Sequence, residues 1–148
     1  MSRIEERLAE MGLILSPPKA PVANYLGTKR SGNLLFISGR VSEKRGQVGT
    51  DVSKEEAKLA ARDTMLDLLA IIQAEVGDLD EIISILKLQG FVNSSPSFSA
   101  LPQIIDGASE LLIALYGESG RHARTATGAA QLPYGATIQL DMVVELRV

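Results

Sequence analysis

Two arginines and the only histidine of the chain lie close together in a stretch of small residues. Residues 121–130 read RHARTATGAA, in which Arg121, His122 and Arg124 are the only charged or titratable side chains. The planar guanidinium of Arg124 matches a carboxylate through two parallel hydrogen bonds, and small neighbours such as Ala126 would let a ligand approach the backbone. A carboxylate-binding site is one interpretation of this pattern. Its alternative is a surface or interface ion pair, usually worth about 0–1 kcal/mol.

His122 lies two residues before Arg124, so in a strand both side chains point to the same side. An imidazole titrates near neutral pH and could act as a base or a ligand donor. The alternative is a histidine that only packs at an interface, and we favour that interpretation.

The composition excludes several classes of site and partner. The chain has 148 residues, 45% of them hydrophobic, which fits one domain over residues 1–148 with a substantial core. A net charge of −3 without a basic cluster argues against nucleic acid as a partner. Cysteine is absent, histidine occurs once and no phosphate-binding glycine loop is present, so we expect no metal and no cofactor.

The sequence also argues against a membrane. Its first residues, MSRIEERLAEMG, are charged and amphipathic, unlike a secretory signal. No apolar run approaches the ~20 residues that a membrane span needs. We therefore expect a soluble, cytoplasmic protein.

Capping residues and apolar periodicity predict one short and two long helices. Ser2 precedes the short helix. Ser53 and Glu56 have the spacing of a capping box, and Gly77 and Gly117 stand where the two long helices should end. The apolar faces of the long helices comprise Ala61, Met65, Leu68, Leu69, Ile72 and Val76, and then Leu101, Ile104, Ile105, Ala108, Leu112 and Leu115.

Five strands are expected around these helices. Residues 22–30 and 34–41 predict a hairpin, and residues 82–93 a strand with Leu86, Leu88 and Val92 on its apolar side. Two more strands should flank residues 132–136. In the last one, the even-numbered residues share one apolar face: Ile138, Leu140, Met142, Val144, Leu146 and Val148.

The element order after the short helix, β-β-α-β-α-β-β, predicts an α+β fold with a single sheet and two helices packed on one face. No element remains to cover the other face, which carries Val143 among polar residues. A partly apolar, uncovered face indicates an oligomer interface with wet clefts.

Four stretches, in order, resemble the YjgF/RidA superfamily, also known as L-PSP endoribonuclease-like. They are NYLGTKRSGNLLFISGR, DVSKEEAKLAARDTMLDLLAII, GDLDEIISILKLQGFVNSSPSF and ARTATGAAQLP. The first holds Tyr25 thirteen residues before Ser38, and the last separates Arg124 from Leu132 by seven residues. The pattern GASELL…GESGRHAR resembles a branch that has diverged from the imine deaminases.

The resemblance implies a chorismate-mutase-like fold and a homotrimer with a ligand cleft at each subunit interface. Well-studied members hydrolyse 2-imino acids to 2-oxo acids and ammonia, with an arginine that grips the substrate carboxylate. Carried over to this chain, the arginine is Arg124. The other substrate-binding positions would be Tyr25, Ser38, Gly39 and Ala126. For Tyr25 the alternative is plain packing with its hydroxyl at a wet edge, and for Ser38 and Gly39 it is the geometry of the hairpin, which we favour slightly.

Gln139 is the important departure from that pattern. It lies fifteen residues after Arg124, where the deaminases carry a glutamate. An amide can hold a water but cannot accept its proton at neutral pH. Gln139 and His122 are then the candidates for orienting a catalytic water.

Two functions therefore stay open: an enzyme that hydrolyses 2-imino or enamino acids, and a non-catalytic binder or sensor of 2-oxo acids or related small carboxylates. The partner in both cases is a small carboxylate-bearing metabolite. The acidic balance of the chain disfavours a third function, endoribonuclease activity.

Overall fold

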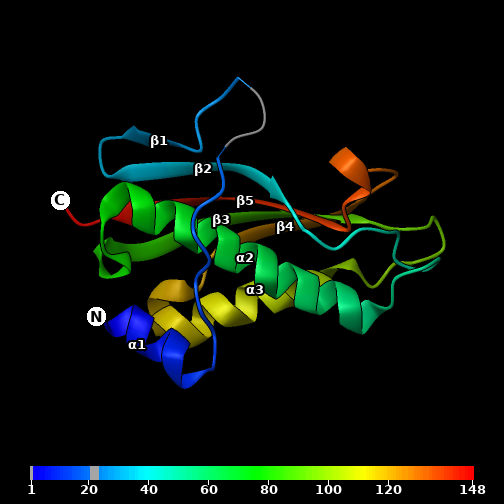
Figure 1. The fold of residues 1–148 in the computed structure, drawn as a ribbon, viewed down its shortest axis with the longest axis horizontal. Helices are drawn as coiled ribbons and strands as arrows, with labels where there is room; N and C mark the ends of the chain where they lie inside the picture. The colour runs from blue at the N-terminus through cyan, green and yellow to red at the C-terminus, as the bar shows by residue number, and fades with distance from the viewer. Residues whose placement is uncertain (1, 21–23) are drawn as a thin grey trace.

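The computed structural model describes residues 2–20 and 24–148 (Figure 1). Its helices are α1 (Arg3–Glu10), α2 (Lys54–Val76) and α3 (Leu101–Tyr116), and its strands are β1 (Thr28–Ser31), β2 (Leu34–Val41), β3 (Ile82–Asn93), β4 (Ala123–Ala129) and β5 (Ile138–Leu146). Three short 3-10 helices join them: η1 (Leu79–Glu81), η2 (Gly117–Gly120) and η3 (Pro133–Gly135). The order of helices and strands is the predicted one.

The strands form one mixed sheet in the order β1-β2-β5-β3-β4. Only the β3–β4 pair is parallel among these neighbours. Helices α2 and α3 lie on one face of the sheet, as Figure 1 shows, and α1 packs Ile4 and Leu8 into the same core. The predicted α+β fold with two helices on one face is confirmed, with α1 as a short third helix. The homotrimer stays a prediction.

The capping residues act as the sequence predicted. The Ser53 Oγ accepts a hydrogen bond from the Glu56 N–H at 3.1 Å, and the Glu56 carboxylate accepts one from the Ser53 N–H at 3.1 Å. Gly77 ends α2 with a φ of 88°, a conformation that glycine adopts without strain. Gly117 ends α3 in the same way, with a φ of 62°.

The core lies between the sheet and the helices, and it departs from the predicted pattern at two positions. Val148 is fully exposed because β5 ends at Leu146, two residues earlier. Leu86 is only partly buried, because the pairing of β3 with β5 shifts register between Ile85 and Lys87. That irregularity gives the core position to Ile85 in place of Leu86.

Strand β1 is shorter than predicted. Residues 24–27 are not in a strand, and residues 22–23 lie outside the described residues. The pairing of β2 with β5 shifts register between Ile37 and Arg40, and the Ser38 N–H makes the last backbone bond toward this segment, to the Gly27 carbonyl at 2.9 Å. On the side of β1, the end of β2 therefore has no paired strand.

Within the described residues, none of the helices combines the length and the apolar character needed to cross a membrane.

Candidate functional site

A cleft of about 880 Å³ opens at the uncovered end of β2. Its walls come from the end of β2, the segment before β1, the loop after β2 and η3. In Figure 1 the segment directly before β1 (residues 24–27) and the orange segment around η3 both lie above the sheet, whereas α2 and α3 lie below it. The cleft is thus built by segments that are far apart in sequence.

Four of the predicted site residues line this cleft: Tyr25, Ser38, Gly39 and Gln139. A Cβ atom added to Gly39 would lie 3.3 Å from the Gln139 Nε2, which is closer than most real contacts of this kind. The glycine therefore leaves room for the Gln139 side chain to lie against the backbone of β2. The Gln139 amide is partly buried and makes no hydrogen bond to any described residue, so its donor and acceptor are free for a ligand or a water.

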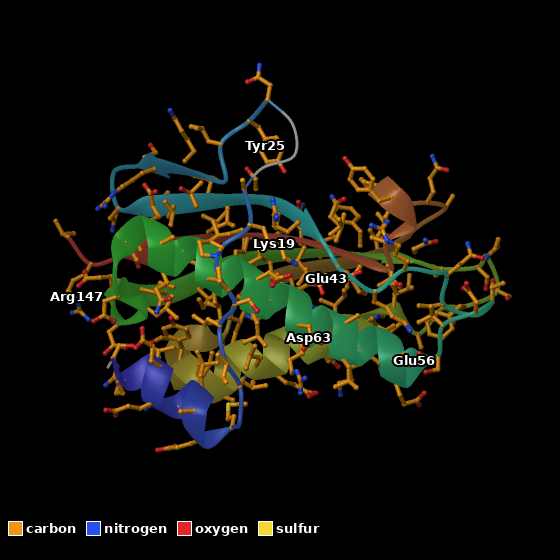
Figure 2. The ribbon with its side chains drawn as sticks, in the orientation of Figure 1. Lys19, Tyr25, Glu43, Glu56, Asp63 and Arg147 are labelled. Carbon is orange, nitrogen blue, oxygen red and sulfur yellow. The ribbon has the colours of Figure 1, made fainter. Side chains whose placement is uncertain are left out.

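Ser38 fixes the segment that carries Tyr25. Its Oγ donates a hydrogen bond to the Leu26 carbonyl at 2.6 Å. Tyr25, the residue before Leu26, is 39% exposed and stands out above β2 in Figure 2. The Ser38 hydroxyl proton is thus used by the backbone, and only its lone pairs can serve a ligand.

Arg124 lies on the other side of the sheet. Its Cα partner in β3 is Leu88, which is fully buried under the helices. The Arg124 Nη1 lies 2.6 Å from the Asp106 Oδ1 and 3.2 Å from the Ser109 Oγ, both on α3. Strands β5 and β3 separate β4 from β2, a distance of about 14 Å at the usual strand spacing.

Ala126 packs partly buried against the same core, so it too lies on the helix side. One copy of the chain therefore does not bring Arg124 or Ala126 together with the four residues of the cleft.

His122 lies beside Arg124, as predicted, and its ring is hydrogen-bonded at both nitrogens. The Nδ1 lies 2.7 Å from the Gly120 carbonyl, which can only accept, so the Nδ1 carries the proton. In the neutral ring the Nε2 then accepts a hydrogen bond from the Ser109 Oγ at 2.9 Å. This arrangement favours the packing interpretation of His122, because neither nitrogen is free to orient a water and the ring does not line the cleft.

Glu43, whose carboxylate lines the cleft, forms an ion pair with Lys19. The Lys19 Nζ lies 2.5 Å from the Glu43 Oε1 and 3.4 Å from the Asp67 Oδ2, and Figure 2 shows Lys19 and Glu43 side by side. The hydrogen bond from Lys19 lowers the pKa of Glu43 below its ordinary value. A carboxylate with a lowered pKa is a weak proton acceptor.

Arg45 and Tyr134 also line the cleft, and sequence reasoning did not find them. Both lie in segments that read as loops, SEKRGQVGTD and LPYGA. The feature that marks Tyr134, a φ of 60°, leaves no signal in the sequence. Arg45 contacts Tyr134 only because two distant loops pair in the folded chain.

Residues 5–146 match the family model described as "YjgF/chorismate mutase-like, putative endoribonuclease". Protein TCP17 of Trypanosoma cruzi is 40% identical, over 97% of this chain and 94% of its own length. The crystal structure of protein Atu1372 from Agrobacterium tumefaciens is 41% identical with a TM-score of 0.89, and the match covers 98% of this chain and 94% of that one. A 2-iminobutanoate/2-iminopropanoate deaminase of Dermatophagoides farinae is 24% identical, over 88% of this chain and 94% of its own length. The chain therefore belongs to the YjgF/chorismate mutase-like family and has its fold.

Proposed function

We propose that this protein binds small 2-oxo and 2-imino acids in a cleft that a second copy of the chain completes, within a homotrimer. The observation that carries the proposal is the separation of the site residues within one sheet. Tyr25, Gly39 and Gln139 line the cleft at the end of β2, whereas Arg124 lies on the edge strand β4, against α3. A joint site needs the β4 edge of a neighbouring copy. Membership of the family and the distant relative named as an imine deaminase support the ligand class.

Arg124 retains donors for a ligand carboxylate although it is paired with Asp106. A guanidinium has five N–H groups, and the described contacts of Arg124 use its Nη1 alone. Its side chain is 24% exposed, so part of it is accessible at the sheet edge. The Asp106 contact would then orient the arginine while the ligand occupies its free side.

The chemistry of the cleft favours binding over fast turnover. Hydrolysis of an imine adds water to the C=N carbon and then releases ammonia, so the attacking water must lose a proton. The Gln139 amide can hold that water but cannot take its proton. Among the described residues, the carboxylate that lines the cleft is Glu43, whose pKa is lowered by Lys19. We therefore expect slow hydrolysis, or binding alone.

The test is calorimetry with 2-oxobutanoate on the wild-type protein and on Arg124→Gln. Loss of a charged hydrogen bond typically costs 1.5–3 kcal/mol, so the variant should bind at least about tenfold more weakly. Arg121→Gln is the matched control, because Arg121 is three residues away, is 66% exposed and pairs with Glu118. Thermal melting shows whether the loss of the Asp106 contact unfolds the variant.

Two results would count against the proposal. Absence of 2-oxobutanoate binding by the folded wild-type protein would contradict the ligand class. Equal affinity in wild type and Arg124→Gln would place the carboxylate anchor elsewhere. In parallel, an amino-acid oxidase that generates 2-iminobutanoate measures hydrolysis directly, as faster imine loss than in a protein-free control.

A further inference from the structure

Arg45 and Tyr134 form a second polar end of the cleft. The Arg45 Nη1 donates a hydrogen bond to the Tyr134 carbonyl, and the Arg45 Cζ lies 5.9 Å from the centre of the Tyr134 ring. The ring is therefore within cation–π range of the guanidinium. The Nε and Nη2 groups of Arg45 have no partner among the described residues. Their N–H groups can therefore donate together to one anionic group of a ligand.

The backbone of Tyr134 is strained. Within residues 2–20 and 24–148, it is the one non-glycine residue with a positive φ, 60°. A non-glycine residue in this conformation costs on the order of 1–2 kcal/mol, and Tyr134 is 63% exposed, so packing in the core does not offset that cost. This strained and exposed turn is therefore a candidate for a ligand contact.

The two loops that carry this pair are held rigidly together. The Ser42 Oγ accepts hydrogen bonds from the N–H groups of Thr137 and Ile138, at 3.2 and 3.0 Å, and donates one to the Lys44 carbonyl at 2.7 Å. The Gly46 N–H donates to the Gly135 carbonyl at 2.9 Å. These bonds lie on both sides of Arg45 and on the C-terminal side of Tyr134, so the pair is positioned before a ligand arrives.

The charge of the cleft also points to an anion. Three cationic side chains line it, Lys19, Arg40 and Arg45, whereas the two carboxylates nearby, Glu43 and Asp67, both pair with Lys19. Neither arginine has an ion-pair partner among the described residues, although the whole chain carries a net charge of −3. A local excess of positive charge in an acidic protein attracts an anionic ligand.

We propose that Arg45 binds a second anionic group of the ligand, so that the preferred ligands are 2-oxo or 2-imino acids whose side chain ends in a carboxylate or a phosphate. The inference rests on the proposed function, in which Arg124 of a neighbouring copy binds the first carboxylate. A cleft of about 880 Å³ lies in the range that holds drug-sized molecules and is large for a four-carbon acid alone.

Calorimetry with three probes at one ionic strength tests this assignment. 2-Oxobutanoate carries one anionic group, 2-oxoglutarate adds a carboxylate, and phosphohydroxypyruvate adds a phosphate. The wild-type protein should bind at least one of the latter two about tenfold more tightly than 2-oxobutanoate. The tighter of the two identifies the second group as carboxylate or phosphate.

Arg45→Gln should remove this preference, weakening the preferred doubly anionic probe about tenfold more than it weakens 2-oxobutanoate. Arg30→Gln is the matched control, because Arg30 is also exposed and also donates to a backbone carbonyl, that of Gly32 at 2.9 Å, but does not line the cleft. Melting temperatures of both variants report whether the loops stay folded.

The outcomes separate this inference from the function on which it rests. If 2-oxobutanoate binds but no probe is preferred, the second anion site is wrong and the proposed function stands. If Arg45→Gln weakens all probes equally, Arg45 binds the first carboxylate and the inference is again overturned. If no probe binds the wild-type protein, the result contradicts both the second anion site and the proposed function.

Discussion

Gln139 is the residue on which we expect hydrolysis in the cleft to depend. Its amide lies against Gly39 with no described partner, where a glutamate of nearly the same shape could accept a proton from water. General base catalysis typically contributes about 10²–10⁴-fold. We expect Gln139→Glu to hydrolyse oxidase-generated imino acids at least about tenfold faster than wild type. The cationic cleft should help to keep the new carboxylate ionised.

Gln89→Glu provides the control for that change. Gln89 lies on β3 in register with Asp141, and it does not line the cleft. An equal gain in both variants would reflect added negative charge alone. If wild type is already fast and Gln139→Glu is no faster, Gln139 is not the missing base.

Some of the site residues could be found from the sequence and others could not. The family resemblance placed Tyr25, Ser38, Gly39 and Gln139 in a cleft, and the structure brings these four together. The contact of Arg124 with Asp106 depends on how α3 packs on β4, and no local pattern encodes it. The pair of Arg45 with Tyr134 likewise depends on two loops that meet only in the folded chain.

Gly107 sets how closely α2 and α3 approach. A Cβ atom at this position would lie 2.1 Å from the backbone carbonyl oxygen of Lys58, so the two helices would have to separate. In an exposed helix, replacing glycine by alanine stabilises by about 1 kcal/mol. Here we expect the opposite sign, a loss of about 1–3 kcal/mol in the free energy of unfolding for Gly107→Ala, measured by denaturant titration. A stabilised variant would show that the helices are not in contact at this point.

Helices were easier to predict from this sequence than strands. The boundaries of α2 follow from Ser53 and Gly77, because caps are local and satisfy the helix's own backbone groups. The position of Leu86 and the start of β1 depend on register shifts between strands that are distant in sequence. Periodicity assumes unbroken alternation, so a bulge shifts every side chain beyond it to the other face.

The face of the sheet opposite the helices is where we expect copies of the chain to associate. On this face Phe36 of β2 and Val143 of β5 are register partners, and Phe36 is 45% exposed. No described element covers this pair, and the cleft opens beside it at the end of the same strand, β2. An apolar patch next to an incomplete site fits an interface between copies of the chain.

Phe36→Asp tests the assembly and the site together. Light scattering should give three times the 15.8 kDa chain mass for wild type and a lower mass for the variant, because a charge in an apolar interface is costly. Leu59→Asp is the control, since Leu59 is 53% exposed on α2, on the helix side of the sheet. It should stay trimeric with unchanged melting.

The same variant separates a cleft completed by a neighbour from one complete in a single chain. Phe36 does not line the cleft, so its replacement removes no contact of the described chain with a ligand. If Arg124 of a neighbouring copy anchors the carboxylate, dissociation alone should abolish 2-oxobutanoate binding, and Leu59→Asp should retain it. A folded monomer that binds 2-oxobutanoate as tightly as wild type would show that the carboxylate anchor lies in the cleft of one chain, with Arg45 as the first candidate.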